Sequence, residues 1–238
     1  GGLGFVVWSE IFQKIRQKKL YFSLHTRIVL IVTFVLIVSG ALLIGVFEWN
    51  NPETLGPLSV QGKILAAFFQ SVTRRTAGFV TLHHDYATML LMFLVGSPGG
   101  TAGGIKTTTF FSVFQYIKAV LTGSSRVHVA HRTIKWSILD TANAILILNM
   151  TIAVISIVLL SVFEPALHLH QIAFEVFSAL GTVGLTTGIT PDLSVASKIV
   201  LILTMFVGRV GVFTILTGYI FRPELPSYTY PEEDIIVG

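Results

Sequence analysis

Cysteine is absent from the 238 residues of this chain, and charged residues are scarce at 12%. Without cysteine there is neither a disulfide framework nor a thiolate metal site. Soluble domains carry about 25% charged residues. Half that share, together with 53% hydrophobic residues, leaves too little polar surface for a water-soluble globule. The shortage of charge favours a membrane protein.

Long uncharged runs take the place of the missing charges. Ile28 to Phe47 is twenty residues without a charge, and a helix of that length is roughly 30 Å long, the thickness of the hydrocarbon core of a bilayer. Further long spans are predicted at about 137–163 and 195–221, after a first span at 28–48. We therefore predict an all-α, multi-pass protein of the cell membrane. Buried helices of a soluble protein are the alternative, which several such runs in one short chain disfavour.

Basic residues gather in two loops between the spans, at residues 14–27 and 118–135. The positive-inside rule places both loops on the cytoplasmic side, and the loops near 50–60 and 164–170 outside. The net charge of +4 arises largely from these loops. It is therefore a sign of the lipid bilayer as partner, and we expect no binding of nucleic acid.

Two apolar segments are too short to cross the membrane. Residues 64–72 and 171–180 are about ten residues each, half the length that a spanning helix needs. Since each leaves and must rejoin the outer side, we expect half-helices that enter and return. Residues 84–122 and 195–221 then cross once each. The order of helix, re-entrant half-helix and helix occurs twice, which predicts repeated helix–pore loop–helix units around a central ion pore.

A short glycine motif follows each predicted half-helix. The two stretches are Thr76-Ala77-Gly78-Phe79 and Thr182-Val183-Gly184-Leu185. Glycine allows backbone conformations that turn carbonyl oxygens toward a common axis, and rings of carbonyls replace the hydration shell of potassium. The half-helices would also point the negative ends of their dipoles at the ion. We predict that these eight residues form a potassium-binding filter. Ordinary helix-capping glycines are the alternative.

The span at 84–122 is interrupted midway. Five glycines and a proline within nine residues cannot hold a continuous helix, so it should break into about 84–95 and 105–122. We predict that this insertion is a gate. Its residues are Ser97, Gly99, Gly100, Thr101, Gly103, Gly104 and Lys106, with Arg209 from the last span. A nucleotide P-loop is disfavoured, because Ile105 separates Gly104 from Lys106 and no strand is expected before it.

Ionisable side chains at membrane depth are costly and by default functional. For Arg209 we expect either a barrier to cations or a bond to carbonyls of the gate. A structural tie to Asp140 or to helix-end carbonyls is the alternative. Arg74 and Arg75 are interpreted as structural charges at the outer rim, with Glu175 or Asp85 as partners. The histidines read as interfacial residues, although their spacing would also suit a metal: His83, His84, His168 and His170.

Seven stretches, in a fixed order along nearly the whole chain, carry a family resemblance. They are Gly1-Gly2-Leu3-Gly4-Phe5, Phe22-Ser23-Leu24-His25-Thr26, Arg75-Thr76-Ala77-Gly78-Phe79, Thr101-Ala102-Gly103-Gly104-Ile105-Lys106, Phe177-Ser178-Ala179-Leu180-Gly181-Thr182-Val183-Gly184-Leu185-Thr186, Met205-Phe206-Val207-Gly208-Arg209 and Tyr230-Pro231. Together they resemble the Trk/Ktr/HKT superfamily of potassium transporters, most closely its KtrB-type membrane subunit. Each glycine motif alone is weak; their order and spacing make the resemblance specific.

The resemblance implies a pore of four linked helix–pore loop–helix units with one filter glycine each. Residues 1–22 would be the last helix of the second unit, and 23–122 the third unit with its broken second helix. Residues 123–222 would be the fourth unit, and 223–238 a cytoplasmic tail. Two filter loops would then be missing. We therefore expect this chain, which begins with glycine and not methionine, to be a fragment of a longer protein.

The resemblance also implies a function. Such proteins take up potassium in a channel-like manner, form homodimers with one pore per subunit, and sit on a cytoplasmic ring of nucleotide-binding RCK subunits that controls the gate. Sodium often stimulates them. A relative that is selective for sodium, or carries both ions, is the alternative. A secondary carrier would need interrupted helices in both halves, and no paired carboxylates or nucleophile–base set suggests an enzyme.

Overall fold

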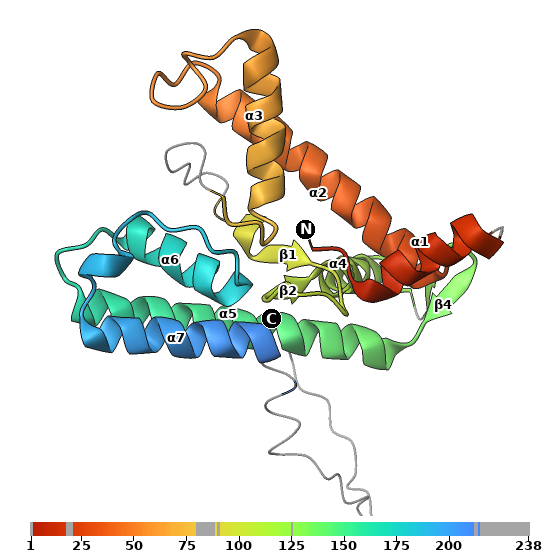
Figure 1. Cartoon of the computed structure of the whole chain (residues 1–238). Coiled ribbons are helices and arrows are strands. Elements are labelled where there is room, and N and C mark those ends of the chain that lie inside the picture. Colours follow the sequence, from red (N-terminus) through yellow and green to blue (C-terminus); the bar gives the residue numbers. More distant parts are fainter. Residues whose placement is uncertain are drawn as a thin grey trace, which may run out of the picture.

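Figure 1 shows a computed structural model of the chain, which describes residues 2–17, 21–79, 89, 91–124, 126–211 and 214. Most of these residues are helical. The elements are α1 (Phe5–Gln17), α2 (Leu24–Glu48), α3 (Val60–Thr73), β1 (Leu94–Gly96), β2 (Ile105–Lys106), α4 (Thr107–Leu121), β3 (Val127–Val129), β4 (Arg132–Ile134), α5 (Trp136–Phe163), α6 (Leu169–Gly181), η2 (Thr190–Asp192) and α7 (Val195–Val210). The predicted tail at 223–238 and the residues His83, His84 and Asp85 lie outside the described part.

The two longest helices, α2 and α5, are long and apolar enough to cross a membrane. They match the predicted spans at 28–48 and 137–163. The α2 helix begins earlier than predicted because Ser23 caps it, its Oγ accepting from the N–H of Thr26 at 3.2 Å. Both helices leave large apolar side chains exposed, among them Phe34 and Val154. Contiguous exposed apolar surface is unfavourable in water and suits contact with lipid.

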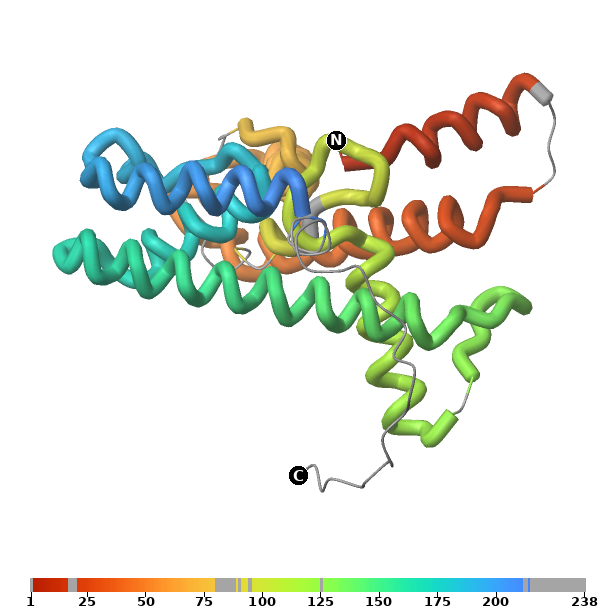
Figure 2. Tube along the Cα trace, turned by 90° about the horizontal axis from the view of Figure 1, so that it is seen from below, coloured from red at the N-terminus to blue at the C-terminus, as the bar shows by residue number. Residues whose placement is uncertain are grey.

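The α3 helix with 14 residues and the α6 helix with 13 are each about 20 Å long, which is too short to span. They contain the predicted half-helices at 64–72 and 171–180. The α6 helix is the most deeply buried, since Ile172, Val176 and Leu180 pack with residues of α5 and α7. Figures 1 and 2 show α5 and α7 side by side, with α6 against them. The α3 helix packs on α2 instead.

The glycine-rich interruption is present, but its flanks differ from the prediction. Leu94–Gly96 forms β1, paired in parallel with β2, where Leu94 faces Ile105 and Gly96 faces Lys106. The helix predicted over 84–95 is therefore wrong at its C-terminal end, where Leu94–Gly96 form a strand before the glycine-rich loop. Most of residues 84–93 lie outside the described part of the chain. A Cβ on Gly96 would lie 2.2 Å from the Cβ of Ala102, so close return of the chain overrides helix propensity here.

Three other segments differ from those predicted. The predicted span at 195–221 is interrupted, since α7 ends at Val210 and Gly211 has a φ of 91° that no helix contains. Of residues 212–221 only Thr214 is described, and it is helical, so the predicted end near 221 lies outside the described residues. The α1 helix runs on to Gln17, through part of the basic stretch predicted as a loop. The second basic loop contains the antiparallel β3–β4 hairpin, whose turn residues Ala130 and His131 have φ of 48° and 62°, as a type I′ turn requires.

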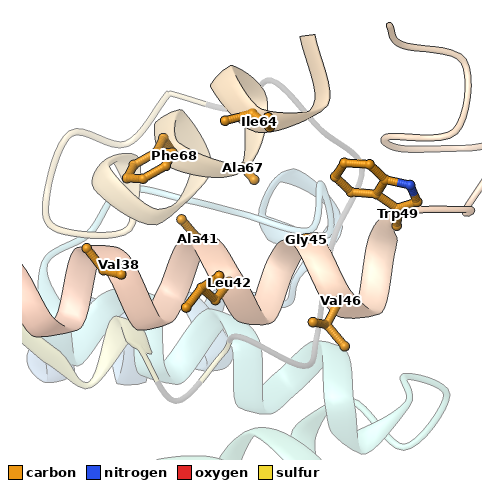
Figure 3. Close-up of a pocket in the computed structure, with 9 residues that line it drawn as sticks. All are labelled: Val38, Ala41, Leu42, Gly45, Val46, Trp49, Ile64, Ala67 and Phe68. Carbon is orange, nitrogen blue, oxygen red and sulfur yellow. The ribbon is translucent and has the colours of Figure 1, made fainter. Parts of the chain in front are cut away.

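An apolar pocket of about 510 Å³ lies between α2 and α3 (Figure 3). Its lining residues are Val38, Ala41, Leu42, Gly45, Val46, Trp49, Ile64, Ala67 and Phe68. None of these side chains offers an oxygen ligand, which a cation such as potassium requires. We therefore infer no ion site in this pocket.

Candidate functional site

The two predicted filter loops meet each other in the folded chain. A Cβ built on Gly184 would lie 3.6 Å from the Cα of Gly78, and one built on Gly78 would lie 2.8 Å from the carbonyl oxygen of Val183. These glycines belong to different repeats, one after α3 and the other after α6. A side chain at Gly78 would collide with Val183, so the glycine there lets the two backbones approach this closely. The contact brings the carbonyls of both loops into one small region.

The backbone of the two loops follows the same conformational pattern. Thr76 and Thr182 have φ of 65° and 52°, and two residues later Gly78 and Gly184 have φ of 73° and 89°. A β-branched residue with positive φ is a genuine outlier and costs of order 1–3 kcal/mol. Such strain collects at functional sites, where the surrounding structure imposes it. Its repetition at matching positions indicates that both loops are built for the same purpose.

Hydroxyl groups of the short helices hold one carbonyl in each loop. Thr73 Oγ1 donates to the carbonyl oxygen of Phe79 at 2.9 Å, and Ser178 Oγ donates to that of Leu185 at 2.5 Å. Both carbonyls belong to the residue after the loop glycine. They are thereby turned toward their own helix. The carbonyls of the preceding threonine, the residue after it and the glycine stay predicted ligands for an ion.

A buried carboxylate organises the chain that follows Gly184. Glu175, in α6, is only 5% exposed. Its Oε1 accepts from Thr186 Oγ1 at 2.6 Å and from the N–H and Oγ1 of Thr187 at 2.8 and 3.0 Å, while its Oε2 accepts from Thr190 Oγ1 at 2.9 Å. Sequence reasoning considered Glu175 only as a partner of the arginines. The run of threonines after the glycine was the signal for this role.

The glycine-rich loop of residues 97–104 touches the second filter loop directly. The N–H of Gly103 donates to Thr182 Oγ1 at 2.9 Å, and a Cβ on Gly103 would lie 2.7 Å from Thr182 Cγ2. The threonine that opens the filter motif is therefore also the contact point of the predicted gate. A movement of this loop away from Thr182 would break that hydrogen bond.

The α7 helix holds the same loop from another side. Arg209 Nη1 donates to the carbonyl oxygen of Thr101, and the N–H of Gly104 donates to the carbonyl oxygen of Gly208 at 3.3 Å. Within the loop, Lys106 Nζ donates to the carbonyl oxygen of Ala102. A bond from Arg209 to a carbonyl of this loop was one of the two roles expected for it. The contact is present, while its part in gating stays a prediction.

The segment before α1 provides a third attachment. Ser97 is fully buried; its Oγ accepts from the N–H of Gly4 at 2.5 Å and donates to the carbonyl oxygen of Gly2 at 3.1 Å. The N–H groups of Ser97 and Phe5 donate to the carbonyls of Gly2 and Gly99 at 2.8 and 3.0 Å. Sequence reasoning placed Ser97 in the gate but missed this partner. The only signal was a second glycine-rich stretch, at the start of the chain.

Comparison with known families decides the identity of this arrangement. The family model for TrkH, described as a cation transport protein, matches residues 1–230. This chain belongs to the TrkH family. The resemblance proposed from the sequence is thereby confirmed.

Two bacterial relatives of this TrkH-family chain are each 38% identical to it. The potassium/sodium uptake protein NtpJ of Enterococcus hirae matches in an alignment 252 positions long, which covers the whole of this chain and 55% of that protein. The Ktr system potassium uptake protein B of Bacillus subtilis matches in an alignment 245 positions long, which again covers the whole chain and 54% of that protein. The chain thus spans about half the length of these relatives.

The TrkH-family fold is also seen in a solved structure. The crystal structure of the potassium transporter TrkH from Vibrio parahaemolyticus superposes with a TM-score of 0.65 at 19% sequence identity, covering 91% of this chain and 48% of that one. The prediction of an all-α membrane fold is confirmed. At this identity the likeness concerns the fold, and the roles of individual residues rest on the contacts described above.

The prediction that Arg74 and Arg75 lie at the outer rim is wrong. Arg74 and Arg75 are 1% and 4% exposed, so they are buried at the end of α3 and not at an outer rim. Arg75 Nη2 donates to Thr33 Oγ1 at 3.3 Å, which ties the end of this helix to α2.

The rings of His168 and His170 stack 5.4 Å apart. Among the described residues, no three His, Cys, Asp or Glu lie close enough to hold a metal.

Gly208→Ala is predicted to destabilise the protein. A Cβ there would lie 2.1 Å from the carbonyl oxygen of Leu180, so α7 would have to move away from α6. Overpacking of this kind costs typically 1–3 kcal/mol, which a lower melting temperature in detergent would reveal. Gly45→Ala in α2 is the matched control, since nothing lies within 4 Å of its Cβ. Equal melting temperatures for both variants would contradict the close contact of the helices.

Glu164 is predicted to make stability depend on acidic pH. The N–H of Ser194 and the hydroxyl of Ser197 donate to its Oε1 at 2.7 and 2.8 Å, and these bonds lower the pKa of the carboxyl. A carboxyl whose pKa is lower in the folded than in the unfolded protein stabilises the fold at pH values above its unfolded pKa of about 4.3. This stabilisation is lost as the pH falls through the folded-state pKa.

The melting temperature should therefore fall on acidification below about pH 4, and Glu164→Gln should remove part of that fall. Glu53→Gln is the control, because no described hydrogen bond reaches the Glu53 carboxylate. An identical acid profile for wild type and Glu164→Gln would show that this carboxylate is not the cause.

Proposed function

We propose that this chain supplies two of the pore loops of a channel-like potassium uptake protein in the cell membrane. The contact between Gly78 and Gly184, with its repeated left-handed backbone, is the observation that carries the proposal. Two strained glycine loops from different repeats, each at the end of a short helix, form a suitable lining for an ion path. The relatives are potassium or potassium/sodium uptake proteins, which supports potassium as the ion.

The filter would be formed by the two motifs predicted from the sequence, with unequal roles within each. The carbonyls of Thr76, Ala77 and Gly78, and those of Thr182, Val183 and Gly184, would bind the ion. Phe79 and Leu185 would fix the loops in place, because their carbonyls are bonded to helix hydroxyls. Two further loops, from the half of the relatives that this chain does not span, would complete the ring.

The loop of residues 97–104 would act as the gate. It bonds to Thr182, to Arg209 and to the segment before α1, so opening requires three attachments to be exchanged. Its glycines allow alternative backbone conformations at little steric cost. We propose that a cytoplasmic RCK-type ring controls this exchange and that the full protein is a homodimer, as the family resemblance implies.

The same resemblance supports the division into units: residues 1–22 as the last helix of a second unit, 23–122 as the third and 123–222 as the fourth. Sodium remains a second candidate ion, because the name of NtpJ includes it. A carrier with broken helices in both halves is less well supported, since the long helix α5 of the second half is continuous.

Uptake of rubidium and sodium by the full-length protein, in cells that lack their own potassium transport, tests the proposal. Rubidium uptake that potassium competes away is the expected result. Sodium uptake without rubidium uptake would overturn the assignment of potassium.

A further inference from the structure

A basic pocket of about 230 Å³ lies at the C-terminal end of α4, apart from the filter and the gate. Its lining residues are Gln115, Lys118, Ala119, Thr122, Ser124, Arg126, Val127 and His128. They come from α4, from the turn after it and from β3. The volume is several times the roughly 30 Å³ that one water molecule occupies in the liquid, which is room for a phosphate group.

The walls of this pocket are held in place by packing. Val127 is buried with Ala119 of α4 and Leu139 of α5, which fixes the hairpin against both helices. Arg126 directly precedes β3 and His128 follows Val127 within it, and both line the pocket beside Val127. Ser124 Oγ donates to the carbonyl oxygen of Arg126 at 2.8 Å, which restrains the turn. The wall that β3 contributes to the pocket is therefore held by packing.

The charge of the pocket is positive and has no internal counterpart. Lys118 and Arg126 both line it, and no carboxylate does so within the part of the chain that the structure describes. Gln115, Thr122 and Ser124 add side chains that form hydrogen bonds. Two cations beside amide and hydroxyl groups are the usual composition of a site for phosphate.

The surroundings place this pocket at the edge of the membrane. Trp136, where the spanning helix α5 begins, packs edge-on against Tyr116 with ring centroids 5.9 Å apart; aromatic residues of this kind mark the membrane–water interface. On α4, apolar side chains are exposed beside the pocket: Phe114 at 60%, Ile117 at 49% and Leu121 at 82%. A basic hollow thus lies next to an apolar helix surface.

We propose that this pocket binds the phosphate headgroup of an anionic phospholipid, whose acyl chain lies along the exposed apolar side of α4. The combination favours a lipid over an acidic peptide, because a peptide would leave the apolar side chains without a partner. Anionic lipids are also concentrated in the cytoplasmic leaflet, where the basic loops are predicted to lie. The α4 helix begins directly after Lys106 at the end of the gate loop, so a lipid bound at its far end would restrain the helix that the gate moves.

The test compares the full-length protein, purified in detergent, with two charge variants. Retention of phosphatidylglycerol and of phosphatidylcholine is measured by native mass spectrometry, with inorganic phosphate as competitor. Lys118→Gln with Arg126→Gln should lower retention of phosphatidylglycerol by about 30-fold relative to wild type. Arg132→Gln is the matched control, because it removes a cation from β4 of the same hairpin but outside the pocket.

Preference for phosphatidylglycerol that is lost in the double variant and kept in Arg132→Gln would support the proposal. Equal loss in both would indicate a diffuse charge effect and overturn it, as would equal retention of the two lipids by wild type. Full displacement by millimolar inorganic phosphate would indicate a site for free phosphate. Unchanged lipid retention together with lost binding of an acidic cytoplasmic partner would make this a protein interface. None of these readouts depends on which ion is transported.

Discussion

Gly184→Ser is expected to lower the preference for potassium over sodium by about tenfold or more in rubidium and sodium uptake by the full-length protein. At Gly184 the φ is 89° and the nearest atom to a built Cβ, the Cα of Gly78, lies 3.6 Å away. There is room for a side chain, but the backbone conformation is unfavourable for one by of order 1–3 kcal/mol. Relaxation would turn the neighbouring carbonyls, and tenfold corresponds to about 1.4 kcal/mol.

Gly188→Ser is the matched control for this variant. Gly188 has a φ of 91°, and nothing lies within 4 Å of a Cβ built on it. A serine there would therefore introduce similar backbone strain just outside the filter motif. Its selectivity should match that of wild type. Gly78→Ser is a poorer test, because a Cβ there would lie 2.8 Å from Val183 O and would damage folding as well. Unchanged selectivity in Gly184→Ser would remove this loop from the filter.

Arg209→Gln is expected to raise basal flux, without any activating subunit, by roughly 10-fold. Arg209 donates to Thr101 of the gate loop, and a hydrogen bond to a charged group contributes about 1.5–3 kcal/mol. If that bond exists only in the closed state, its loss shifts the equilibrium toward the open one. Rubidium efflux from liposomes that contain the full-length variant would measure the change.

Lys198→Gln is the control for Arg209→Gln, because Lys198 Nζ also bonds a carbonyl, that of Pro191, but at the other end of α7. Flux that stays at the wild-type level in Arg209→Gln, with an unchanged melting temperature, would leave this arginine a purely structural role. Deleting Pro98 to Gly103 should also raise basal flux. It is a blunter change, because two remaining residues cannot connect the parallel strands β1 and β2.

The chain's local composition was enough to predict the helices. The α2, α3, α5 and α6 helices include the predicted segments, because apolar runs and their lengths depend only on neighbouring residues. The break near Gly99 was equally predictable, since glycine and proline oppose helix wherever they occur in number. The strand at Leu94–Gly96 was not, because its pairing partner at Ile105 is set by a turn whose geometry no local rule describes.

The sequence by itself determined that this is a helical membrane chain with two repeated glycine loops and an interrupted span. Composition, run length and motif order are properties of the chain alone, and they sufficed for the TrkH family. Only the tertiary structure decided that Gly78 meets Gly184, that Glu175 binds three threonines and that Ser97 is fixed by Gly2 and Gly4. Each of these contacts joins residues on different elements or turns, and so depends on where packing brings distant backbone groups within hydrogen-bond reach.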